Sequence, residues 1–203
     1  MNSTQYKKAL WLSYFTVAYN VLEGIVSILA GWLSGSIALA GFGLDSFVES
    51  LSSTVMIWRF RKHGKISEAE EERVEKTAIR LVAYTFFILA SYVAYESLKK
   101  LYLREPPDPS LLGIIIAIVS LIVMPVLFYM KYRTAQSLQS GSLTVDSKQT
   151  LACVFLSLSL LIGLGLNYVY GIWQADPVVG LVIVIFLTRE GLAALREEKL
   201  CSC

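Results

Sequence analysis

The chain has 203 residues, of which 55% are hydrophobic and only 17% are charged, and its mean hydropathy is +0.58. A water-soluble domain of this length cannot bury so much apolar surface in one core, so the composition indicates a membrane protein. The net charge of +2 is small, and no run of basic residues is interleaved with aromatic ones. Nucleic acid is therefore excluded as an expected partner.

Six segments come close to the roughly 20 mostly apolar residues that a membrane-spanning helix needs. They lie at residues 9–32, 36–58, 79–98, 110–131, 142–167 and 176–195. The first segment is too long for the apolar part of a cleavable signal peptide, and further spans follow it. The sequence thus predicts an all-α, polytopic membrane protein whose residues 1–203 form a single domain of six transmembrane helices.

The links between the predicted spans are short or marked by residues that end helices. The turn at 34–36 joins the first two spans as an antiparallel hairpin, and the prolines at 106, 107 and 109 define a loop before the fourth. Asp176, followed by Pro177, is typical of a helix start at which Asp176 caps the sixth helix. The small residues Gly31, Gly35, Gly41 and Gly43 predict close helix packing around the second span.

The basic residues predict the orientation of the chain. Only Lys99, Lys100 and Arg104 flank the spans on one side. The basic residues on the other side are Lys7, Lys8, Arg59, Arg61, Lys62, Lys65, Arg73, Lys76, Arg80, Lys131, Arg133, Arg189, Arg196 and Lys199. By the positive-inside rule both termini are predicted to be cytoplasmic, which requires an even number of spans. The expected location is a multi-pass position in the cytoplasmic (inner) membrane if the organism is a prokaryote.

The second predicted span contains two carboxylates at membrane depth. Asp45 and Glu49 are one helical turn apart and share a face. Such groups repel unless a cation or a proton lies between them, so the pair suits a carrier that exchanges a divalent cation for protons. The alternative is structural: Asp45 caps a neighbouring helix or pairs with Lys148, and Glu49 is protonated and packed.

The fifth predicted span carries Asp146, Gln149 and Cys153 on one helical face. Carboxylate, amide oxygen and thiolate together suit zinc better than magnesium. Lys148 points away from this face, near the cytoplasmic interface, where a lysine can extend into water. Pairing of Lys148 with a carboxylate inside the membrane is the alternative.

The first span adds Asn20 and Glu23, which could join the site from a neighbouring helix. An interhelical hydrogen bond is the favoured role for Asn20, and the role of Glu23 is left open. An enzyme is not expected, because the single histidine, His63, lies in a loop and no nucleophile has an obvious base. No prosthetic group is expected, and neither is a metal role for the terminal Cys201 and Cys203.

These features resemble the cation diffusion facilitator, or cation efflux, family of six-span exporters of zinc and related divalent ions. Residues 35–40 leading to Asp45 and Glu49 look like the second span of that family, where two ligands four residues apart bind the metal. Residues 142–153 look like its fifth span, and residues 175–177 like the start of its sixth. The resemblance implies metal ligation by Asp45 and Glu49, completed by Gln149 and Cys153, with Asp146 as an orienting residue or additional ligand.

The chain departs from the family pattern at two places. Gln149 and Cys153 stand where the family usually has His and Asp, so the negative charge rests on Asp45 and Glu49. No cytoplasmic domain is expected after the sixth span, and the run from Asp146 to Thr150 looks most like a short branch of the family that includes vesicular zinc-transporting membrane proteins. The resemblance implies a homodimer that exports Zn²⁺ by proton antiport. The alternative is a non-transporting scaffold or regulatory metal-binding protein with a degenerate site.

Overall fold

A computed structural model describes residues 3–62, 68–104, 108, 110–138 and 140–200, and these residues contain six helices and no strand. The helices are α1 (Ser3–Ser34), α2 (Ile37–Lys62), α3 (Glu68–Leu103), α4 (Leu111–Leu138), α5 (Gly141–Tyr170) and α6 (Ala175–Leu200). Each predicted span lies on one helix, which confirms the all-α prediction. Residues named above that lie outside the described ones are His63, Lys65, Pro106, Pro107, Pro109, Cys201 and Cys203.

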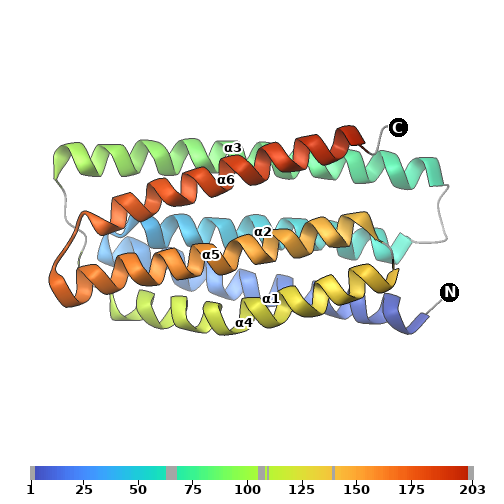
Figure 1. Cartoon of the computed structure of the whole chain (residues 1–203), viewed down its shortest axis with the longest axis horizontal. Helices are drawn as coiled ribbons and strands as arrows, with labels where there is room; N and C mark the ends of the chain where they lie inside the picture. Colours follow the sequence, from blue (N-terminus) through green and yellow to red (C-terminus); the bar gives the residue numbers. More distant parts are fainter. Residues whose placement is uncertain (1–2, 63–67, 105–107, 109, 139, 201–203) are drawn as a thin grey trace.

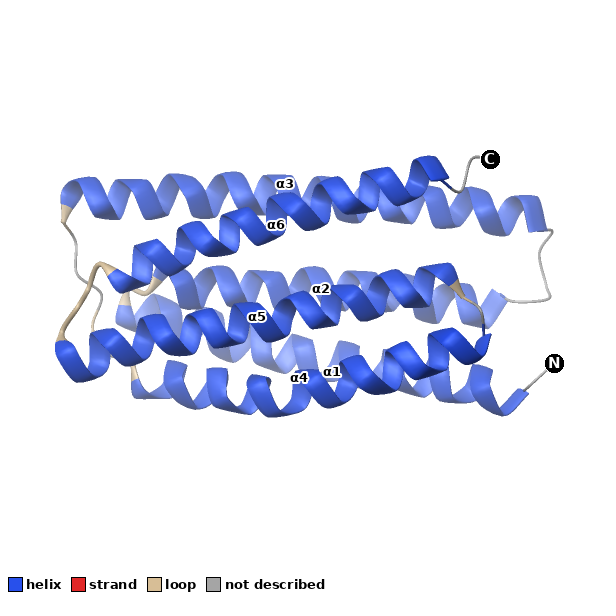
Figure 2. Ribbon diagram, in the orientation of Figure 1, coloured by secondary structure: helices blue, strands red, loops and turns tan. Residues whose placement is uncertain are grey.

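The helices run alternately up and down along one long axis, and the start of α1 and the end of α6 lie at the same end of the bundle (Figure 1). The most extensive pairings are α1 with α2, α4 with α5, and α3 with α6. Helices α2 and α5 lie between the α1–α4 and α3–α6 pairs (Figure 2). Because α2 also contacts α3, α5 and α6, its side chains face the centre of the bundle.

The hairpin between α1 and α2 is built by residues that the sequence marks as a turn. Gly35 has a φ of 64°, the left-handed conformation that glycine adopts readily and that ends α1. The Ser36 hydroxyl accepts a hydrogen bond from the backbone nitrogen of Leu39 at 3.1 Å, as an N-cap does. This local pattern ends one helix and starts the next.

Asp176 caps a different helix from the one predicted. Its carboxylate accepts hydrogen bonds from the backbone nitrogen of Ile37, at 3.1 Å, and from the Ser36 hydroxyl. Helix α6 already begins at Ala175, so Asp176 lies in its first turn and satisfies the open start of α2 instead. The prediction that Asp176 caps the sixth helix is therefore wrong, because the sequence does not show that the starts of α2 and α6 are adjacent.

Helices α1 and α2 approach each other closely because small residues line their contact. A Cβ atom added at Gly43 would lie 2.9 Å from the carbonyl oxygen of Gly24, and one at Gly31 would lie 2.7 Å from the backbone nitrogen of Ala40. Larger side chains would push the helices apart. This geometry brings the polar residues of α1 within hydrogen-bonding distance of those on α2.

Among the residues that the structure describes, three segments are long and apolar enough to cross a membrane: Gln5–Ser34, Leu111–Leu138 and Ser142–Tyr170. Large apolar side chains are exposed on the outside of the bundle, among them Trp11, Leu22, Trp32, Ile122 and Val126. Polar side chains are buried inside, including Ser13, Thr16, Asn20 and Ser27 on α1 and Ser120 on α4. An apolar exterior around a polar interior is the arrangement expected of a membrane bundle.

Candidate metal centre

Two carboxylates of α2 and one thiol of α5 meet inside the bundle. Asp45 and Glu49 are one turn apart on α2, and both are buried, as is Cys153. The Cys153 thiol lies 2.9 Å from Glu49 Oε2 and 3.2 Å from Asp45 Oδ2, so it stands between the two carboxylates and can donate to either of them. The structure thus brings together one predicted ligand from the fifth span and both predicted ligands from the second.

Gln149 lies beside this group. It lines a narrow pocket together with Asp45, Cys153 and Glu190, and the pocket lies between α2, α3, α5 and α6. The Gln149 side chain is buried, yet its amide nitrogen has no hydrogen-bond partner within the described parts of the chain. A buried amide with an unused donor is costly unless something occupies the pocket, so Gln149 is a candidate contact for a ligand or a water molecule there.

Glu190 was not among the predicted site residues. It lies on α6, near the end of the predicted sixth span, and its sequence neighbours include the basic Arg189. The sequence alone indicates only that Glu190 belongs to the charged end of the sixth predicted helix. The fold turns it toward the same pocket as Asp45, which only the packing of α6 against α2 and α5 determines.

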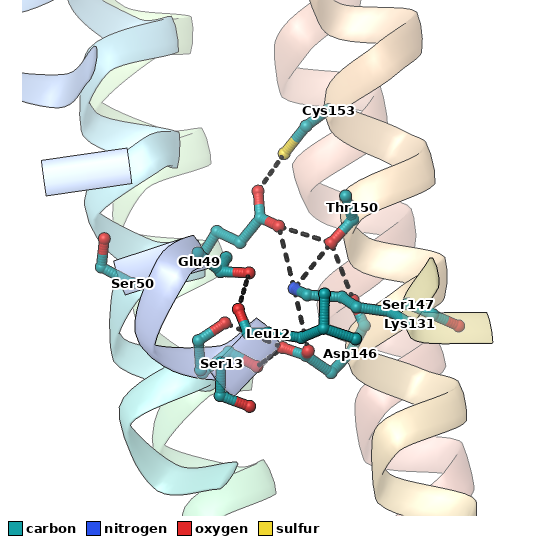
Figure 3. A network of polar contacts seen from close by, with 12 residues as sticks. Leu12, Ser13, Glu49, Ser50, Lys131, Asp146, Ser147, Thr150 and Cys153 are labelled. Carbon is teal, nitrogen blue, oxygen red and sulfur yellow. Dashed lines mark hydrogen bonds and ion pairs between the residues drawn. The ribbon is translucent and has the colours of Figure 1, made fainter. Parts of the chain in front are cut away.

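A lysine from α4 lies at the centre of the polar network (Figure 3). The Lys131 side chain is fully buried, and its ammonium lies 2.9 Å from Asp146 Oδ2 and 3.5 Å from Glu49 Oε1. The ammonium also donates to the Thr150 hydroxyl at 2.9 Å. That hydroxyl in turn lies 2.5 Å from Glu49 Oε1. The site therefore contains a positive charge of its own.

Asp146 occupies the far side of this lysine. Its Oδ2 makes the ion pair with Lys131, and its Oδ1 accepts hydrogen bonds from Ser52 at 3.1 Å and Ser53 at 3.3 Å. Both serines belong to α2, so Asp146 links α2, α4 and α5. The two oxygens of the Asp146 carboxylate thus face different partners, the Lys131 ammonium on one side and the serines of α2 on the other.

The structure corrects the predicted position of one lysine, Lys131. Lys131 was placed with the basic residues that flank the membrane, but it is buried two turns before the end of α4. Lys148 is on the exposed side of α5, in agreement with the favoured prediction that it extends into water. The sequence does contain a signal for the burial of Lys131. Its spacing places it on the same helical face as Ser120, Met124 and Leu127, which are buried.

The residues of the first span join the site only in part. Glu23 accepts hydrogen bonds from Tyr19 at 2.8 Å and from Ser46, the neighbour of Asp45 on α2, at 2.9 Å. Asn20 is fully buried, but neither its amide nitrogen nor its amide oxygen has a hydrogen-bond partner among the residues that the structure describes. The predicted interhelical hydrogen bond of Asn20 is therefore wrong.

The side chains would have to rearrange before they could bind a metal ion. Within the described residues, no group of three or more His, Cys, Asp or Glu side chains could hold a metal ion as they stand. Here the Cys153 thiol lies within hydrogen-bonding distance of the carboxylates, whereas a metal requires the thiolate. If the thiol lost its proton, the Cys153 sulfur and the carboxylate oxygens of Asp45 and Glu49 would be available as ligands close to one another.

The fold and this site together define a helical membrane protein with buried carboxylates in its interior. A model of the cation efflux transmembrane domain matches residues 13–200. The chain therefore belongs to the cation efflux family, which points to a transporter rather than an enzyme.

The relatives are distant in sequence. The chain is 23% identical to Transmembrane protein 163 of Xenopus laevis, over 94% of this chain and 67% of that protein. It is 24% identical to the cation-efflux pump FieF of Salmonella typhi and 22% identical to that of Cronobacter sakazakii, in each case over 83% of this chain and 57% of the pump. The chain thus spans less than two thirds of the length of these pumps.

Proposed function

We propose that the protein carries a divalent cation, with zinc as the expected ion, through the bundle and out of the cytoplasm in exchange for protons. The ligands would be Asp45, Glu49 and Cys153, with Gln149 as a neutral oxygen ligand. The observation that carries the proposal is the Cys153 thiol, which stands between both α2 carboxylates at 3.2 Å and 2.9 Å inside the bundle. Sulfur and carboxylate oxygen together form a ligand set that zinc accepts.

The charges support a divalent cargo. Asp45 and Glu49 supply two negative charges in a buried position, and a doubly charged ion would neutralise them there. Because the Cys153 thiol must lose its proton to become a ligand, loading releases at least this proton from the site. Proton release on loading is what an exchange of metal for protons requires.

Orientation and assembly belong to the same proposal. The basic residues near the chain ends and between α2 and α3 favour cytoplasmic termini, and the start of α1 and the end of α6 lie at the same end of the bundle (Figure 1). Lys131 is buried and no longer belongs to this group, but the remaining basic residues on the predicted cytoplasmic side still far outnumber those on the other side. We propose a multi-pass protein of the cytoplasmic membrane, working as a homodimer.

The test is zinc uptake into proteoliposomes under an imposed pH gradient. We expect flux with the natural chain and none with Asp45→Asn, because the variant loses one of two charged ligands. Glu96→Gln is the matched control, since Glu96 pairs with Lys99 on α3 at 3.6 Å and lies outside the site. Absence of zinc flux from folded natural protein, or equal flux in Asp45→Asn, would contradict the proposal.

A non-transporting scaffold is the second candidate, and one observation favours it. Lys131 already lies between Glu49 and Asp146 and offsets one of their two negative charges, so the interior is partly charge-balanced without a metal. A scaffold should bind no divalent ion in detergent and should pass none in proteoliposomes. Binding that is abolished by Asp45→Asn would decide against it.

A further inference from the structure

The two oxygens of Glu49 face different partners. Oε2 lies 2.9 Å from the Cys153 thiol, on the side of Asp45. Oε1 lies 2.5 Å from the Thr150 hydroxyl and 3.5 Å from the Lys131 ammonium. One carboxylate is therefore shared between the proposed metal ligands and a fixed positive charge.

Lys131 is held firmly in this position. Its ammonium has two further partners, Asp146 and Thr150, each at 2.9 Å, and its side chain is fully buried. Met124 and Leu127, which precede Lys131 on the same face of α4, belong to a buried apolar cluster that also contains Leu12. A buried charge with such partners stays where its ion pair is.

We propose that Lys131 is a built-in counter-cation that sets the affinity of the metal centre. It offsets part of the negative charge of Glu49, so an arriving divalent ion meets a weaker ligand and a nearby positive charge. A carrier has to release its metal ion as well as bind it, and a lower affinity of the site for the ion makes release easier. This inference rests on the proposed function, because it concerns the same site.

Asp146 affects how strongly Lys131 acts on Glu49. It competes with Glu49 for the same ammonium and lies closer to it, at 2.9 Å compared with 3.5 Å. The serine hydroxyls of α2 hold the Asp146 carboxylate from its other side. Asp146 is thus a positioning residue, which limits how strongly Lys131 opposes metal binding at Glu49.

The two roles predict affinity changes of opposite sign. In the double variant Lys131→Met with Asp146→Asn, the closer ion pair is removed as a unit, so net charge is kept and Glu49 is left free of the ammonium and available to the metal ion. We expect its dissociation constant for Zn²⁺ to fall by about tenfold or more, which is the effect of ~1.4 kcal/mol. In Asp146→Asn alone, Glu49 becomes the main carboxylate partner of the Lys131 ammonium. We therefore expect Zn²⁺ to bind this variant more weakly than the natural chain.

The measurement is calorimetric titration of the full chain in detergent with Zn²⁺, alongside thermal unfolding to show that each variant is folded. Lys148→Met is the matched control, a lysine on the exposed side of α5 whose loss should leave the dissociation constant unchanged. Lys131→Arg keeps the charge and should keep the weak affinity. If the double variant fails to fold, the weaker binding expected of Asp146→Asn still tests the inference.

The outcomes separate this inference from the function on which it rests. Equal Zn²⁺ affinity of the natural chain, the folded double variant and Asp146→Asn would overturn the role of Lys131 and leave the metal centre standing. Loss of binding in the double variant would also overturn it, because Lys131 would then support the site. Absence of Zn²⁺ binding by every form, the natural chain included, would overturn the proposed function and this inference together.

Discussion

Asp146 Oδ2 and Lys131 Nζ lie 2.9 Å apart in the interior of the bundle, where their side chains are 1% and 0% exposed. This pair joins α5 to α4 by a contact that neither helix reveals alone. Breaking a buried ion pair by removing one partner is strongly destabilising, since a charge is left without compensation.

The pair predicts a large stability difference between two lysines. Lys131→Met should lower the free energy of unfolding by about 3–5 kcal/mol, because Asp146 and Glu49 lose their cation. Lys148→Met should change it by less than about 0.5 kcal/mol, as exposed substitutions usually do. Thermal unfolding in one detergent measures both, and equal melting temperatures would show that Lys131 does not hold the bundle together.

Cys153 predicts a preference for soft ions. Cys153→Ser keeps a hydrogen-bond donor between the carboxylates but removes the thiolate, so Cd²⁺ affinity should fall much more than Mn²⁺ affinity. With Co²⁺ as a probe, the sulfur-to-metal charge-transfer band of the natural chain should disappear. Ser157→Ala is the control, one turn along α5, where the hydroxyl bonds to Ser120 at 2.9 Å. A charge-transfer band that persists in Cys153→Ser would assign the sulfur ligand elsewhere.

Asn20 predicts a stabilising substitution. The hydrogen bond between Glu23 and Ser46 sets the register of α1 against α2, and this places Asn20 at the level of Glu49. Both polar atoms of its amide lack a hydrogen-bond partner in the described structure. Asn20→Leu should therefore raise the free energy of unfolding by about 1–2 kcal/mol, measured without metal. A lower melting temperature would mean that the amide has a partner, such as a water molecule or a cation.

The contact between α1 and α2 predicts a difference between two glycines. A Cβ at Gly43 would lie 2.9 Å from Gly24 O and from the Ile28 and Ser27 side chains, whereas a Cβ at Gly165 would meet nothing within 4 Å. Gly43→Ala should cost about 1–3 kcal/mol through overpacking. Gly165→Ala should be neutral or stabilising by up to ~1 kcal/mol, because it favours the helix. Equal effects would show that α1 and α2 separate easily.

The elements were predictable because each depends on local sequence. Apolar runs of spanning length locate the helices, and the left-handed Gly35 beside Ser36 ends one helix and starts another. The one-turn spacing of Asp45 and Glu49 fixes their common face whatever surrounds them. The same argument places Gln149 and Cys153 on one face of α5.

The partners across helices were not predictable in this way. A lysine near a helix end looks the same in the sequence whether it extends into water or turns inward, and the packing of α4 against α5 decided that Lys131 turns inward. Asp176 reaches the start of α2 because α6 begins beside it, and Glu190 lines the same pocket as Asp45 because α6 packs against α2. The sequence by itself determined the helices and which residues share a face, since both follow from helical periodicity. Only the tertiary structure decided which charges neutralise one another, because ion pairs between helices depend on distances that no local pattern contains.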